Sequence, residues 1–217
     1  MSAFARYLLA GICLAVAARP LGASVVAYNN EAAWLAAAGA VDVIDFEGIA
    51  PTDGDALFLN PSGLTLSNVT FNDVADELWV FDANFLPPYT NWGSGADLIT
   101  NAFNDTVTAT LPAGGVLAVG ADIFTVAPDG QHMLVGLSTT NTYLPATHAN
   151  PNLTFVGFVS TTPITFITFE GIDSATGLDN FSFSAPSTPE PDTVFAGILG
   201  LAALAARRAR IRFRPRP

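Results

Sequence analysis

A series of short apolar or alternating runs extends from residue 41 to residue 183. Glycine, proline, asparagine and aspartate separate the runs, and turns favour these residues. In residues 105–111 threonines alternate with apolar residues, which indicates a strand with one buried face. Residues 116–121 are apolar on both faces, which indicates a central strand. The pattern predicts an all-β sandwich or barrel, because no regular alternation of strands and helices accompanies it.

We expect nine strands in this region, at residues 41–46, 64–71, 78–81, 106–111, 116–124, 132–137, 153–159, 164–169 and 178–183. An extended segment at residues 25–28 and one short Ala-rich helix precede them. Asn30 can cap the start of this helix, and Gly39 can end it in the left-handed conformation. At 217 residues the chain has room for one such domain and short appendages.

Residues 1–23 have the order of a secretory signal peptide. Arg6 ends a short basic start, residues 7–18 are mainly apolar, and small residues lead to a cleavage site that we expect after Ala23. Cys13 is the only cysteine and would be removed with this segment. The exported domain, residues 24–186, would therefore contain no disulfide.

Residues 187–217 form a second targeting segment at the other end of the chain. It consists of Pro-Glu-Pro at 189–191, an apolar stretch at 193–206 that we expect to be helical, and an arginine-rich tail at 207–217. The two prolines keep the motif extended and accessible to a processing enzyme. The apolar stretch is shorter than the ~20 residues of a standard span. The arginine cluster that begins with Arg207, Arg208 and Arg210 would stay in the cytoplasm and hold the domain across the inner membrane.

Pro189, Glu190 and Pro191, together with the apolar stretch and the arginines, resemble the PEP-CTERM protein-sorting signal. The resemblance implies that an exosortase-type membrane enzyme recognises the motif and processes the tail. It also implies a Gram-negative bacterium that secretes exopolysaccharide. The protein would pass through an inner-membrane-anchored intermediate to the cell surface or extracellular matrix. The alternative is an ordinary C-terminal membrane anchor.

The charges are separated along the chain. Residues 24–186 contain 17 of the 19 acidic residues and no lysine or arginine. A surface without cations cannot hold phosphates, which argues against nucleic acid or an anionic membrane as a partner. Such a domain suits divalent cations better, although acidity that only maintains solubility explains the same composition.

The domain also contains several short motifs in a defined order along the chain. They lie at residues 44–47, 63–64, 69–71, 114–122, 155–160, 163–169 and 178–183. This order is similar to that of the jelly-roll, carbohydrate-binding-module-like domains common in PEP-CTERM proteins. The resemblance spans residues 24–184 and implies a jelly-roll β-sandwich.

Acidic residues near the first and last strands form a candidate calcium site. Because these strands often pair in jelly rolls, Asp45 and Glu47 would lie near Asp179, with Glu170 or Asp173 close by. Calcium takes six to eight oxygen ligands, and clustered carboxylates repel each other unless a cation lies between them. We therefore take Asp45, Glu47, Glu170 and Asp179 as candidate ligands. The alternative is a set of solvated loop acids.

The loop at residues 85–95 offers aromatic side chains beside amides and hydroxyls. Sugar rings stack on aromatic faces, so Tyr89, Asn91 and Trp92 are candidate glycan contacts. In the alternative, Trp92 fills the end of the sandwich. His132 and His148, the only histidines, fit no catalytic triad or zinc site, and we assign no catalytic residue.

Three functions follow from these features. The first is a non-catalytic envelope or matrix protein that binds exopolysaccharide or stabilises a biofilm. The second is a secreted hydrolase that uses two of the acids as general acid and base on a polysaccharide. The third is a scaffold without a small ligand.

Overall fold

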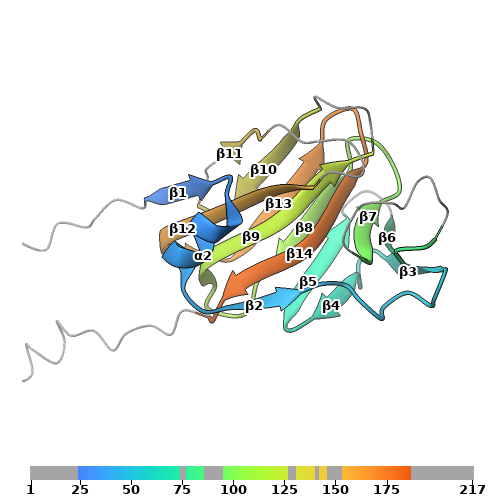
Figure 1. Cartoon of the computed structure of the whole chain (residues 1–217), viewed down its shortest axis with the longest axis horizontal. Helices are drawn as coiled ribbons and strands as arrows, with labels where there is room; N and C mark the ends of the chain where they lie inside the picture. The colour runs from blue at the N-terminus through green and yellow to red at the C-terminus, as the bar shows by residue number, and fades with distance from the viewer. Residues whose placement is uncertain are drawn as a thin grey trace, which may run out of the picture.

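The computed structural model describes residues 24–73, 77–85, 95–126, 131–139, 142–145 and 153–186. These residues fold into two antiparallel β-sheets (Figure 1). The eight-stranded sheet has the order β1 (Val25–Tyr28), β12 (Thr154–Ile164), β9 (Val116–Thr125), β14 (Thr176–Ser184), β7 (Asp97–Thr100), β6 (Glu77–Phe81) and β3 (Asp55–Leu59), and β2 (Val41–Ile44) also pairs with β14. The six-stranded sheet has the order β11 (Thr142–Tyr143), β10 (Met133–Leu137), β13 (Phe166–Gly171), β8 (Thr106–Thr110), β5 (Val69–Asp73) and β4 (Leu64–Leu66).

The predicted signal peptide at 1–23 and the predicted sorting tail at 187–217 lie outside the described residues. The same holds for the Pro-Glu-Pro motif and the arginine cluster. Within the part of the chain that the structure describes, no helix has the length and apolar character needed to cross a bilayer.

The path of the chain between the sheets makes the fold a jelly-roll β-sandwich. From β7 onward the chain passes back and forth: β7, β9, β12 and β14 belong to the eight-stranded sheet, and β8, β10 and β13 belong to the six-stranded sheet. All registered pairs are antiparallel, including that of β2 with β14, the expected pairing of the first and last strands. The prediction of an all-β sandwich with one short helix is confirmed.

Residues 64–71 are one place where the structure differs from the predicted strand. They form two strands, β4 and β5, that pair as a hairpin with Leu66 opposite Val69. The residues at the turn, Ser67 and Asn68, have φ angles of 48° and 64°. Two successive residues with positive φ match the right-handed twist of a tight hairpin, so the chain folds back here instead of continuing.

The predicted helix is α2 (Glu31–Ala38), and its ends are formed as expected. Asn30 Oδ1 accepts a hydrogen bond from the Ala33 N–H at 2.9 Å, and Gly39, with φ of 78°, ends the helix. Trp34 attaches α2 to the eight-stranded sheet, because its indole N–H donates to the Phe158 carbonyl at 3.1 Å.

The core lies between the two sheets and is rich in phenylalanine. Phe71 packs edge-on against Phe46 and Phe181, with ring centroids 5.3 and 5.1 Å apart, and Phe169 from the six-stranded sheet contacts the same group. All four rings are almost fully buried. Because no disulfide is available between residues 24 and 186, burial of this apolar surface supplies the main stabilisation.

Candidate functional site

The outer face of the eight-stranded sheet carries three aspartates on adjacent strands, which we call the acidic row. The register pairs Asp122 of β9 with Asp179 of β14. The pairing of Leu178 with Leu98 then puts Asp179 opposite Asp97 of β7. Leu178 and Leu98 belong to the core between the sheets, and side chains alternate along a strand, so the aspartates point to the outer face.

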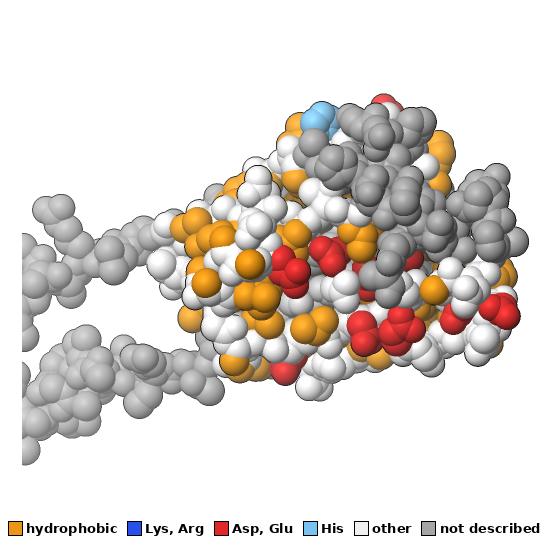
Figure 2. Space-filling view, viewed as in Figure 1, with side chains coloured by type: hydrophobic (Ala, Val, Ile, Leu, Met, Phe, Trp, Pro, Cys, Tyr) orange, Lys and Arg blue, Asp and Glu red, His pale blue; other side chains and the backbone are white. Residues whose placement is uncertain are grey.

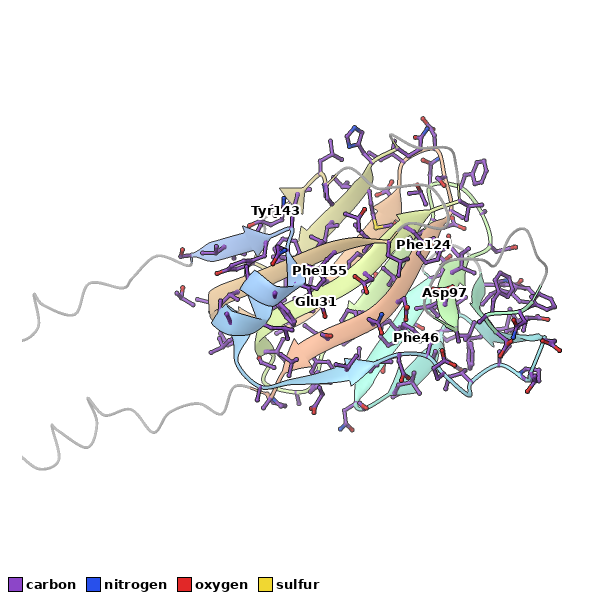
Figure 3. All side chains as sticks on the ribbon, in the orientation of Figure 1. Glu31, Phe46, Asp97, Phe124, Tyr143 and Phe155 are labelled. Carbon is purple, nitrogen blue, oxygen red and sulfur yellow. The ribbon has the colours of Figure 1, made fainter. Side chains whose placement is uncertain are left out.

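Asp97 is the most perturbed member of the acidic row. Its side chain is 1% exposed, and its Oδ1 atom has no hydrogen-bond partner. Burial, followed by the negative charges of Asp179 and Glu47, raises the pKa of Asp97 to about 9. A carboxyl group in this position keeps its proton at neutral pH unless a cation compensates its charge. Asp97 is labelled in Figure 3, where it extends from β7.

Glu47 is fixed beside the acidic row by contacts with the segment that precedes β7. Its Oε1 atom accepts a hydrogen bond from the Ala96 N–H at 2.9 Å. A Cβ atom at Gly95 would overlap this oxygen, so the close approach of the Glu47 carboxylate requires glycine there. The Glu47 N–H donates to Asp45 Oδ1 at 3.2 Å. Asp45 therefore supports the Glu47 loop from the solvent side.

Asn180 links the other two members of the acidic row. Its side-chain amide donates to Asp122 Oδ2 at 3.0 Å and to Asp179 Oδ2 at 3.1 Å. Burial raises the pKa of Asp122, and the hydrogen bond from Asn180 opposes that effect. The Asn180 amide thus bridges the two neighbouring carboxylates and stabilises both.

Three of the four predicted calcium ligands lie in or next to the acidic row, and the fourth, Glu170, lies in the other sheet. Glu47 and Asp179 both act on Asp97 through their charges, and Asp45 is exposed and bonded to Glu47. Glu170 lies on β13 in the six-stranded sheet, where its strand neighbours are Thr106 and Leu134. Among the described residues, no three His, Cys, Asp or Glu side chains converge in a geometry suited to a metal ion.

An aromatic pocket adjoins the acidic row on the same face of the sheet. Phe81 pairs with Asp97 on one side and with Asp55 on the other, so the row leads directly into the pocket. The pocket has a volume of about 550 Å³. Its lining is mainly apolar and comprises Asp55, Trp79, Phe81, Phe85, Ile99, Thr100, Asn101, Phe103, Val126 and Ala175.

The aromatic residues of the pocket form a connected group. Trp79 and Phe81 have ring centroids 6.1 Å apart, and Phe81 and Phe85 have centroids 5.3 Å apart. Phe103 is 62% exposed, so its ring is accessible from solvent. The Trp79 indole nitrogen is buried without a hydrogen-bond partner. Aromatic rings at an open pocket and an unsatisfied donor in its wall are features of a binding site.

Tyr89, Asn91 and Trp92, the predicted glycan contacts, lie outside the described residues. Phe85, where their loop begins, lines the pocket. Trp79, Phe81 and Phe103 were not among the predicted contacts. Trp79 and Phe81 occur in an alternating strand in which either face could be buried.

No protein-family model matches this chain, and no curated protein matches it. Among solved structures, it is similar to a family 6 carbohydrate-binding module, with 15% identity, a TM-score of 0.33, and coverage of 59% of this chain and 92% of that one. It is similar at 15% identity and a TM-score of 0.33 to TmCBM61 in complex with β-1,4-galactotriose, over 60% and 99% of the two chains. The family 11 module of a Clostridium thermocellum cellulosomal cellulase gives 12% identity, a TM-score of 0.31, and coverage of 70% and 98%. The order of the strands in the two sheets defines the jelly-roll fold of this chain.

Proposed function

We propose that this protein is an exported, non-catalytic carbohydrate-binding module whose aromatic pocket holds the sugar. The observation that supports the proposal most directly is the group of Trp79, Phe81, Phe85 and Phe103 at one pocket on the sheet face. Aromatic rings offer flat apolar surfaces that match the C–H faces of pyranose rings, and stacking of this kind needs little rearrangement. A partly exposed ring such as Phe103 is available for it.

The polar groups of the pocket suit sugar hydroxyls. Asp55 supplies acceptor oxygens, and the unsatisfied Trp79 N–H supplies a donor once the wall adjusts to a ligand. A buried donor without a partner costs about 1–3 kcal/mol, so a ligand oxygen that reaches it would recover part of that free energy. The pocket therefore combines stacking surface with a few directional hydrogen bonds, as small-molecule sites generally do.

The cellular context belongs to the same proposal. The leader at residues 1–23 and the Pro-Glu-Pro tail support export followed by processing by an exosortase-type enzyme in the inner membrane. The ligand would then be exopolysaccharide at the surface or in the biofilm matrix of a Gram-negative bacterium. Intact-mass measurement of the protein from cells and from medium tests this part, because it locates both processed ends. Recovery from the cytosol with both ends intact would exclude export.

Affinity electrophoresis tests the binding function. Purified protein is run in native gels that contain xyloglucan, galactomannan, mixed-linkage glucan, dextran, alginate, polygalacturonate or no polysaccharide. We expect at least one polysaccharide to retard the protein, and Phe103→Ala and Trp79→Ala to reduce the retardation. Phe166→Ala is the matched control, because Phe166 is 40% exposed but lies in the six-stranded sheet. Circular dichroism verifies that each variant folds. Retardation by none of the gels, or equal retardation of all variants, would reject the proposal.

Hydrolysis has a weaker basis than binding. A glycosidase needs two carboxyl groups on either side of the scissile bond. Among the described residues that line the pocket, Asp55 is the one carboxylate. Asp97 and Asp179 are 1% and 2% exposed, so neither has access to a polymer in the pocket. We therefore propose binding without turnover, and release of reducing ends from a bound polysaccharide would contradict it.

We also propose that a calcium ion occupies the space between Glu47, Asp97 and Asp179. The buried Asp97 oxygen without a partner supports this, and carboxylate oxygens are the ligands that calcium prefers. Because the three side chains do not already converge, binding must draw Glu47 or Asp179 toward Asp97. Backbone carbonyls and water would complete the shell.

Thermal unfolding with calcium and with EDTA tests the metal site. A ligand at 100 times its Kd stabilises the folded state by about 2.7 kcal/mol, so calcium should raise Tm measurably. Asp179→Asn should abolish the increase, and Glu170→Gln in the other sheet should preserve it. Identical Tm values in calcium and EDTA would reject the site.

A further inference from the structure

Several acidic residues lie at or next to the pocket, at one end of β3 and β6. Asp55 lines it directly, and Asp97 lies on the other side of Phe81. Asp53 and Asp82 are joined at the same ends of β3 and β6, because the Asp53 N–H donates to Asp82 Oδ1 at 3.3 Å. Asp82 directly follows Phe81, and its N–H donates to the Gly54 carbonyl at 3.0 Å. Asp55 therefore lines the pocket, and Asp53 and Asp82 lie at the ends of β3 and β6 next to it.

No positive side chain compensates these charges within the domain. The sequence has no lysine or arginine between residues 24 and 186, and Figure 2 shows Asp and Glu but no Lys or Arg among the described side chains on the face in view. A sugar carboxylate in the pocket would lose water and meet like charge, with no cationic donor to pair with it. An uncharged pyranose has neither cost, because its hydroxyl groups can donate to the carboxylates.

We infer that the aromatic pocket selects its saccharide by charge: it takes sugars without acidic groups and excludes uronic-acid residues. This inference rests on the proposed carbohydrate binding and names the ligand class of that same pocket. It follows from Asp55 in the pocket lining, from Asp53 and Asp82 at the adjoining ends of β3 and β6, and from the absence of lysine and arginine between residues 24 and 186.

The expected selectivity is large enough to measure. A like charge about 6 Å from one carboxylate, at an effective dielectric constant of about 40–80, weakens binding by about three- to tenfold. With more than one carboxylate near the pocket, we expect at least a tenfold difference at 20 mM salt. At 0.5 M salt the difference should shrink, because the Debye length falls below these separations.

The test compares a polysaccharide with its own oxidised form. A neutral polysaccharide that retards the full-length protein and carries free C6 hydroxyl groups is oxidised at C6 to the corresponding uronate. Both forms are titrated by calorimetry in EDTA at low and high salt. The protein carries glutamine in place of the six tail arginines, because these could hold an anionic polymer by themselves; they are Arg207, Arg208, Arg210, Arg212, Arg214 and Arg216.

Oxidation at C6 can weaken binding through charge repulsion or through a poorer fit and lost hydrogen bonds at C6. Charge variants of the protein distinguish these two causes. The triple variant Asp53→Asn, Asp55→Asn, Asp82→Asn removes three charges and keeps one acceptor oxygen at each position. It should reduce the penalty for the oxidised polymer by tenfold or more. Glu31→Gln is the matched control, because Glu31 lies on α2, which packs against β12 near the opposite edge of the sheet (Figure 3).

Each outcome has a distinct meaning. A tenfold or greater loss of affinity on oxidation that is reduced by salt and by the triple variant supports charge selection. Equal affinity for the two forms, or a loss that neither salt nor the triple variant changes, overturns charge selection and leaves carbohydrate binding intact. Binding only to the anionic polymers of the gel panel also overturns it. Failure of every polysaccharide to bind removes the proposed function itself.

Discussion

The charge of Asp97 should make the calcium-free protein less stable as the pH rises. The ordinary pKa of an aspartate is 3.8, and burial with two acidic neighbours raises that of Asp97 to about 9. Between these values the folded protein holds a proton that the unfolded chain has released. Raising the pH therefore favours unfolding across this window, and the contribution of Asp97 is greatest below pH 4.

The size of the effect follows from the shift. One proton of difference changes the free energy of unfolding by about 1.4 kcal/mol per pH unit, or about 4 kcal/mol between pH 5 and pH 8. The raised pKa of Asp122 acts in the same direction. Asp97→Asn removes the ionisable group and gives an amide that can donate a hydrogen bond to Glu47 or Asp179. The substitution should therefore remove the part of the pH dependence of the free energy of unfolding that Asp97 causes.

Urea unfolding in EDTA at pH 5, 6, 7 and 8 measures this dependence. As the pH rises, the free energy of unfolding of the wild type should fall faster than that of Asp97→Asn. The difference between the two slopes should be about 1.4 kcal/mol per pH unit. Asp53→Asn serves as the control, because Asp53 is exposed and should leave the slope unchanged. Parallel curves for wild type and Asp97→Asn would refute the argument that Asp97 is protonated in the folded state. Calcium should flatten the wild-type curve, because a bound cation replaces the proton.

Three further predictions concern the framework of the site. Phe71→Ala removes a fully buried ring that packs on Phe46 and Phe181 and should cost about 3–5 kcal/mol in urea unfolding; a cost below 1 kcal/mol would contradict the packing. Gly177→Ala would put a Cβ atom into the Phe124 ring, so Tm should fall, and an unchanged Tm would show that the ring moves freely. Trp34→Phe loses the hydrogen bond to the Phe158 carbonyl and should cost about 1–3 kcal/mol, whereas Leu35→Ala on the exposed side of α2 should cost less; equal losses would argue against that bond.

Much of the fold could be predicted because its strands alternate in the usual way. Residues 106–110 show this most clearly, since Val107 and Ala109 are buried and the threonines are not. β7 was missed because Asp97–Thr100 is buried on both faces and has no alternation. β3 was missed because its edge position leaves apolar residues such as Leu57 and Leu59 exposed, which blurs the pattern.

The site could be predicted only in part. Pairing of the first and last strands brought Glu47 and Asp179 into one region, because that pairing is a property of the fold. Asp97 joins them through the register of β7 against β14, and a sequence does not state which strands become neighbours. Glu170 follows a strand pattern as clear as that of Asp179, but its strand belongs to the other sheet.

The length of β9 determines how the pocket is presented. Val116, at the start of this strand, forms a bridge with Pro186, the last residue that the structure describes. Figure 1 shows β9 running through the middle of the eight-stranded sheet. Val126, just past the other end of the strand, lines the pocket. Ten residues of strand span about 33 Å. Pro186 and the proposed sugar site therefore lie near opposite ends of β9, separated by the length of the sandwich.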